Sequence, residues 1–147
     1  MSFREKSAWA CTITTLVVFV PYFANVFRRF GRDDLYSAPL LTAFIAAVIF
    51  AVILNVAAHI AIAIRSGREQ RDERDLAIES KSLRNAYAVL AFSSMSIVCA
   101  LVAAASTPTP WHRLLAPAFV SQMLLLCFIV AETTKYVTQA ISYRLGS

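Results

Sequence analysis

Charge is scarce along most of this chain, and its scarcity excludes an ordinary soluble domain. Asp, Glu, Lys and Arg make up 16% of the 147 residues, whereas 59% of the residues are apolar. Soluble domains carry about 25% charged and about 45–50% apolar residues. Four apolar runs, each near the roughly 20 residues that cross a bilayer core, take up most of the sequence. We therefore predict an all-α, polytopic membrane protein with a single domain over residues 1–147, surrounded by a lipid bilayer.

Cysteine and histidine are too few and too scattered to predict a cofactor or a metal site. Cys11, Cys99 and Cys127 all lie in apolar runs, without a disulfide framework or zinc-ligand spacing, and are expected to be small buried hydrophobic residues. His59 and His112 are far apart, and the sequence contains no glycine-rich phosphate loop and no G-x-S-x-G motif. We therefore expect a protein that is not an enzyme, with no catalytic residue, cofactor or metal.

Polar segments divide the chain into two helical hairpins joined by a charged connector. The predicted membrane helices cover about residues 8–27, 38–64, 86–105 and 114–134, and the helical connector covers about residues 65–85. No Pro or Gly lies between Asp72 and Ala105, so the third helix is expected to begin in water and to continue into the membrane. Leu76, Leu83 and Tyr87 recur there at helical spacing. The similar layout of the two halves leaves open whether they are internal repeats.

Small residues at every fourth position mark one face of the second and third predicted helices. They are Ala43, Ala47 and Ala51 on the second helix and Ser96, Ala100 and Ala104 on the third. Such spacing lets helix backbones approach closely in lipid. We expect the two stripes to pack against other helices, with packing against each other as one alternative.

The distribution of Lys and Arg predicts the orientation in the membrane. The two termini and the connector together carry ten of these residues, and the two opposite loops carry four. Because the more basic side faces the cytoplasm, both termini and the connector are predicted to be cytoplasmic, in the inner membrane of a bacterium. The connector has six basic and five acidic residues. It therefore lacks the basic stripe of a direct nucleic-acid interface.

Two polar pairs at membrane depth form a candidate intramembrane site. Asn55 and His59 are four residues apart on the second helix, and Glu132 and Lys135 are three apart on the fourth. Both pairs fall near the predicted inner boundary, where they could meet, with Glu132 as the counter-ion of Lys135 or His59. One interpretation is a cation or proton relay in a small transporter or channel subunit, which would need a homo-oligomer because a four-helix bundle has little interior for a pore. The alternative is interhelical hydrogen bonding without transport.

The connector offers a candidate docking surface for a protein partner. Its charged residues are Arg71, Asp72, Glu73, Arg74, Asp75 and Glu79. The carboxylates alone would suit a divalent cation, but the interleaved arginines would repel one. Alternating charges on an ordered helix instead give a partner specificity and orientation.

These residues carry a resemblance to a known group. The run from Asp72 to Asp75, with Arg84, Glu132-x-x-Lys135-Tyr136 and a Tyr143-Arg144 exit, resembles small bacterial four-helix membrane proteins with an Asp-Glu-Arg-Asp connector between two hairpins. The chain end after Arg144 is less basic than in that group. The resemblance implies no activity. It does imply that proteins of this kind accompany small helix-turn-helix transcription regulators, which would fit a docking role. We therefore expect a non-enzymatic membrane protein whose connector docks a cytosolic or membrane protein, for example a transcription regulator or a membrane subunit.

Small multidrug-resistance antiporters, which have four short helices and act as dimers, are the other comparison. Their essential carboxylate lies in the first membrane helix. Residues 8–27 of this chain contain no acidic residue, so the likeness fails at that position.

Overall fold

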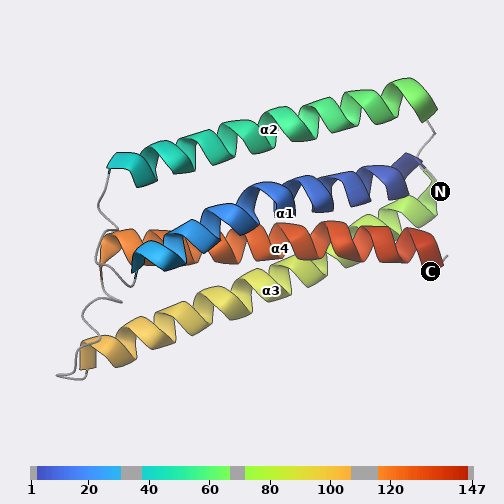
Figure 1. Ribbon diagram of the computed structural model, residues 1–147. Helices are drawn as coiled ribbons and strands as arrows, with labels where there is room; N and C mark the ends of the chain where they lie inside the picture. The colour runs from blue at the N-terminus through green and yellow to red at the C-terminus, as the bar shows by residue number, and fades with distance from the viewer. Residues whose placement is uncertain (1–2, 31–37, 67–71, 107–115, 146–147) are drawn as a thin grey trace.

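The computed structural model is all-helical over the residues that it describes, 3–30, 38–66, 72–106 and 116–145 (Figure 1). The helices are α1 (Phe3–Phe30), α2 (Ala38–Ser66), α3 (Glu73–Ser106) and α4 (Pro117–Leu145). All four are long and apolar enough to cross a membrane. The chain is therefore a multi-pass membrane protein, as its composition predicts.

The helices extend beyond the apolar runs at several ends. Helix α1 begins at Phe3 instead of near residue 8, and Glu5 lies in its first turn, where the helix dipole favours a carboxylate. Helix α2 continues to Ser66, and α4 continues through the tail to Leu145. The predicted start of the fourth helix at residue 114 lies outside the described residues. Helix α4 begins instead at Pro117, a residue suited to the first helical position because its missing N–H needs no partner there.

Helix α3 begins within the charged connector, as predicted, because two aspartates cap its first turn. Asp72 Oδ1 accepts a hydrogen bond from the Glu73 backbone N–H at 2.7 Å, and Asp75 Oδ2 accepts one from the Asp72 backbone N–H at 3.0 Å. Side-chain acceptors at these positions satisfy N–H groups that have no partner within the helix. At 34 residues, α3 is about 50 Å long, so its charged first turns project beyond a hydrocarbon core of about 30 Å.

The helices form a row in the order α2, α1, α4, α3, with both termini at one end (Figure 1). Contacts join α1 with α2, α1 with α4, and α3 with α4; in the described ranges the α2 backbone does not closely approach that of α3 or α4. Helix α1 is the most enclosed. Of the residues in its most apolar stretch, 50% are buried inside the protein, against 6% for α2 and α3 and 11% for α4. Most of the surface of α2 and α3 is therefore left to lipid or to another protein.

The largest core cluster centres on the second half of α1. Its buried members are Val18, Phe19, Tyr22, Phe23, Val26 and Ala51. Ala43 and Ala47 of α2 pack against this cluster. The predicted small-residue face of α2 is therefore confirmed as a packing face, and its partner is α1. The Tyr22 and Phe23 rings meet edge to face with centroids 5.2 Å apart, a favoured aromatic geometry.

The small-residue stripe on α3 does not pack against α2, because α1 and α4 lie between these helices. Ser96 and Ala100 instead line an apolar groove beside α4. The buried face near the start of α3 is formed by Ile78, Ser82 and Ala86. Ala104, the third residue of the predicted stripe, is buried, and so is Ser82, in the connector-derived part that sequence reasoning treated as solvated.

The two hairpins do not occupy equivalent places in the row. Helix α1, the first helix of its hairpin, lies in the interior, whereas α3, the first helix of the second hairpin, lies at an edge (Figure 1). The two hairpins meet through α1 and α4. Whether the halves share an origin stays a prediction, but their packing roles differ.

Candidate functional site

Interhelical polar contacts concentrate in the half of the molecule that holds both termini. There they form two groups, which we call the polar layer (Ser7, Cys11, His59, Glu132 and Lys135) and the terminal latch (Arg4, Asp75 and Tyr143). In the other half, Tyr22 Oη donates a hydrogen bond to Gln122 Oε1 at 2.8 Å, joining α1 to α4. The polar contacts thus lie nearest the end that the charge distribution predicts to be cytoplasmic.

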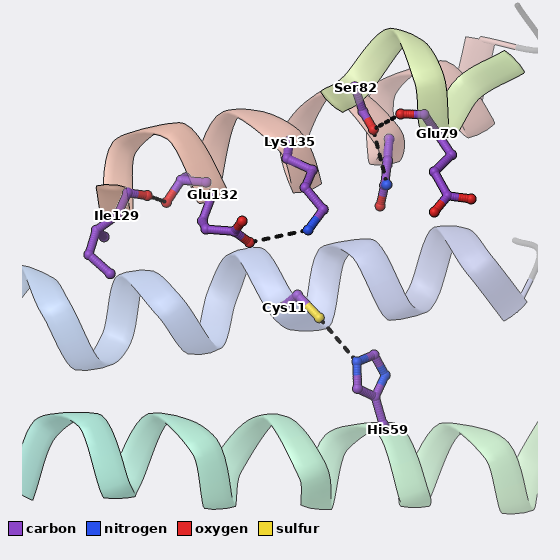
Figure 2. Close-up of polar contacts among 9 residues, drawn as sticks. Cys11, His59, Glu79, Ser82, Ile129, Glu132 and Lys135 are labelled. Carbon is purple, nitrogen blue, oxygen red and sulfur yellow. Dashed lines mark hydrogen bonds and ion pairs between the residues drawn. The ribbon is translucent and has the colours of Figure 1, made fainter. Parts of the chain in front are cut away.

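His59 of α2 is held by two side chains of α1. Its Nδ1 lies 3.0 Å from Ser7 Oγ, and its Nε2 lies 3.5 Å from Cys11 Sγ. Ser7 and Cys11 are one helical turn apart and therefore share a face of α1. Figure 2 shows the Cys11 sulfur directed across the helix interface at the imidazole ring. Both ring nitrogens of His59 thus have partners on the neighbouring helix.

Glu132 and Lys135 form an ion pair on α4. Lys135 Nζ donates a hydrogen bond to Glu132 Oε2 at 3.3 Å and lies 4.8 Å from the centre of the Tyr136 ring. Figure 2 shows both charged groups reaching from α4 toward α1, on the side of that helix opposite His59. Because α1 and α4 are in contact, the ion pair lies at their interface, in Figure 2 at the level of Cys11.

The two predicted polar pairs do not touch directly, because α1 separates α2 from α4. Cys11 stands between them and contacts His59. Asn55 lies one turn along α2 from His59, accepts a hydrogen bond from Thr14 Oγ1 at 2.8 Å, and donates one to the Ala51 carbonyl at 3.0 Å. Of the four predicted intramembrane polar residues, Asn55 and His59 have hydrogen-bond partners on α1, whereas Glu132 and Lys135 pair with each other within α4.

The terminal latch joins the ends of three helices through one carboxylate. Asp75 Oδ2 lies 3.2 Å from Arg4 Nε, and Asp75 Oδ1 accepts a hydrogen bond from Tyr143 Oη at 3.1 Å. The side chains of Arg4 and Asp75 are 23% and 13% exposed, so this ion pair is shielded better than a surface pair. Asp75 therefore ties α1 and α4 to the start of α3 while it also caps α3.

A second contact between α3 and α4 lies farther from the helix ends than the terminal latch, by two turns on α3 and one turn on α4. Gln139 Nε2 donates a hydrogen bond to Ser82 Oγ at 3.1 Å, and Ser82 Oγ donates to the Glu79 carbonyl at 2.7 Å (Figure 2). Ser82 and Ala140 are both 0% exposed. The charged part of α3 is therefore packed firmly against α4.

The structure divides the predicted docking residues into different environments. Asp72, Glu73 and Arg74 are exposed, whereas Glu79 is half-buried and Asp75 belongs to the latch. Arg71 lies outside the described residues. The exposed part of the predicted docking surface is thus the group Asp72, Glu73 and Arg74.

Sequence reasoning missed Arg4, Ser7 and Tyr143, and it assigned Cys11 only a packing role. Cys11 and Cys127 are buried, as predicted, whereas Cys99 is exposed, and Cys11 also contacts His59. The four-residue spacing of Ser7 and Cys11 was visible, yet only the order of the helices shows that His59 faces them.

The groove between α1 and α4 is mostly apolar. The described residues contain no cluster of three or more His, Cys, Asp or Glu side chains that could hold a metal ion. The groove, of about 510 Å³, is lined mostly by apolar side chains such as Phe19, Phe23, Ile129 and Val137. Binding pockets combine such walls with a few convergent polar groups. The polar side chains of this groove are threonines, so its chemistry suits a hydrocarbon chain.

Comparison with known proteins adds no relative to this picture. No protein-family model, no curated protein and no solved structure matches the chain.

Proposed function

We propose that this protein is a non-enzymatic protein of the bacterial inner membrane whose charged first turns of α3 dock a partner protein in the cytoplasm. The partner would be a soluble protein, such as a transcription regulator, or a subunit of a membrane complex. Both termini would lie on the same side as the docking surface, in agreement with the excess of Lys and Arg there.

The observation that carries this proposal is a charged helix end that is held in place yet keeps charged side chains on its surface. The latch at Asp75 and the Ser82–Gln139 hydrogen bond fix the start of α3 to α1 and α4. Glu73 and Arg74 remain exposed on the same turns. Charges held on a rigid element lose less freedom on binding than charges on a mobile loop.

Charge reversal at the exposed pair tests the docking function. In the doubly substituted chain Glu73→Lys and Arg74→Glu, net charge is unchanged but the order of the charges is inverted. A photo-reactive amino acid placed at residue 81, which is exposed on the same side of α3 as Arg74, should form one discrete adduct with the partner in cells. We expect the double substitution to abolish that adduct, because a complementary partner would then face like charges.

Arg144→Glu provides the matched control, since Arg144 is exposed at the same end of the molecule but belongs to α4. This variant should keep the adduct, and all variants should remain in the membrane fraction. An adduct of unchanged yield in the charge-inverted chain would refute docking through Glu73 and Arg74.

The polar layer supports a second candidate function, a small oligomeric transporter or channel subunit using His59 and Glu132. The supporting observation is that Cys11 contacts His59 while the Glu132–Lys135 pair lies on the other side of α1, so polar groups of three adjacent helices lie at one level. Such groups near the membrane boundary are suited to passing a cation or a proton.

Flux measurements distinguish this candidate from a structural polar layer. In vesicles reconstituted with the full chain, Glu132→Gln should abolish pH-driven cation flux if Glu132 is the coupling residue, because the amide cannot ionise. Asn55→Ser is a suitable control, since it alters a neighbouring polar residue that cannot titrate. Equal flux in the Glu132→Gln variant and the unmodified chain would exclude Glu132 from coupling.

A further inference from the structure

Three residues that predict helix formation in the connector do not face the protein interior. Leu76, Leu83 and Tyr87 are 53%, 49% and 74% exposed, whereas the buried face of this segment consists of Ile78, Ser82 and Ala86. At about 100° per residue, the three exposed side chains and the exposed Ser80 project from one side of α3. We call these four residues the α3 seam.

The position of the α3 seam argues for a protein partner instead of lipid. Leu76 and Leu83 lie among the charged residues Arg74, Lys81 and Arg84, before the long apolar part of α3 begins near residue 86. Side chains there project beyond the hydrocarbon. Exposed leucines are unfavourable in water, and a row of them along one side of a fixed helix is typical of a helix–helix contact.

The spacing of the α3 seam follows the heptad pattern of a two-stranded coiled coil. With Ser80 and Tyr87 at the positions called a, Leu76 and Leu83 fall at the positions called d. In this register Glu79 occupies a g position and Arg84 occupies the e position of the next heptad. In a parallel pair of identical helices, these are the positions whose side chains meet across the interface. Opposite charges at these two positions are therefore complementary to a second copy of the same helix.

The membrane determines the relative direction of the two α3 helices. Two copies inserted with the same topology place their α3 helices parallel to each other, as the g-to-e pairing requires. Helix α3 lies at an edge of the row and touches α4, so its other side is open to a neighbour (Figure 1). Glu79 already interacts within its own chain, but a carboxylate accepts about four hydrogen bonds and has room for a second cation.

We infer that two copies of this chain form a parallel, two-fold symmetric dimer through the α3 seam, with Glu79 of each copy paired to Arg84 of the other. A two-fold axis parallel to the membrane normal makes both contacts equivalent. In this register Glu73 falls at the a position before Leu76, at the end of the seam, whereas Arg74 and Lys81 lie away from the seam, where a cytosolic partner could still reach them. This inference does not depend on the docking function.

Cysteine cross-linking in membrane vesicles tests the dimer. The full chain carries serine at Cys11, Cys99 and Cys127, and a single cysteine is introduced by Ser80→Cys or Leu83→Cys. Mild oxidation should give a disulfide-linked dimer for both variants. Lys81→Cys is the matched control, because Lys81 is exposed on the same turn but projects from a different side of α3. This variant should remain monomeric.

Charge exchange tests the proposed pairing separately. In the Ser80→Cys background, Glu79→Arg alone and Arg84→Glu alone should each lose the cross-linked dimer, because like charges would then meet. The two substitutions together should restore it, which also shows that the single variants did not fail merely by misfolding. Cross-linking of equal yield at residues 80, 81 and 83, no cross-linking at residues 80 and 83, or no recovery in the double variant would each overturn the inference. None of these outcomes bears on partner docking, since the cross-linking involves this chain alone.

Discussion

Replacing Asp75 with alanine is expected to lower the free energy of unfolding by about 2–4 kcal/mol, because one substitution removes an ion pair, a hydrogen bond and a helix cap. Arg4 and Tyr143 would lose their common partner, and the Asp72 backbone N–H would lose its acceptor. Unfolding in mixed micelles with increasing denaturing detergent measures the change. Spin labels on cysteines at residues 6 and 144, which are exposed, should report a longer and broader distance distribution between the helix ends.

Glu73→Ala is the control for this prediction, since it removes an exposed carboxylate from the same turn. Its effect should stay within about 0.5 kcal/mol, as is usual for surface substitutions. Combining Asp75→Ala with Arg4→Met should cost less than the sum of the two single effects, because both remove the same ion pair. Simple additivity, or an effect of Asp75→Ala no larger than that of Glu73→Ala, would contradict the role assigned to the latch.

Ala140→Leu should destabilise the packing of α4 by about 1–3 kcal/mol, the range for overpacking a well-packed site. Ala140 is 0% exposed, and α4 packs against both α1 and α3. Three additional carbon atoms at this fully buried position would force α4 away from a neighbouring helix. The same detergent titration measures the effect, and a spin-label pair on α3 and α4 measures the helix separation.

Ala88→Leu provides the control for the second substitution. It adds the same volume at an exposed position of α3 and should leave both stability and helix separation nearly unchanged. If Ala140→Leu is tolerated as well as Ala88→Leu, close packing by small residues does not hold these helices together.

The charge pattern of the connector does not distinguish residues that face a partner from residues that pair within the protein. Arg74 and Asp75 are adjacent in the sequence and equally polar, and both were predicted to face a partner. The structure leaves Arg74 exposed and places Asp75 in the latch, because Arg4 and Tyr143 arrive from helices remote in the sequence. A long-range contact of this kind leaves no local signal in the sequence.

The sequence by itself determined that this chain is helical, that it crosses a membrane, and that its third helix begins in the charged connector. These conclusions follow from composition and periodicity, since apolar runs of this length need hydrocarbon and a backbone in hydrocarbon must satisfy its own hydrogen bonds. Only the tertiary structure decided the order α2, α1, α4, α3, the bridging position of Cys11 and the outward direction of Leu76 and Leu83. The reason is that a helix in lipid is apolar on nearly every side, so hydrophobicity does not identify the side that meets another helix.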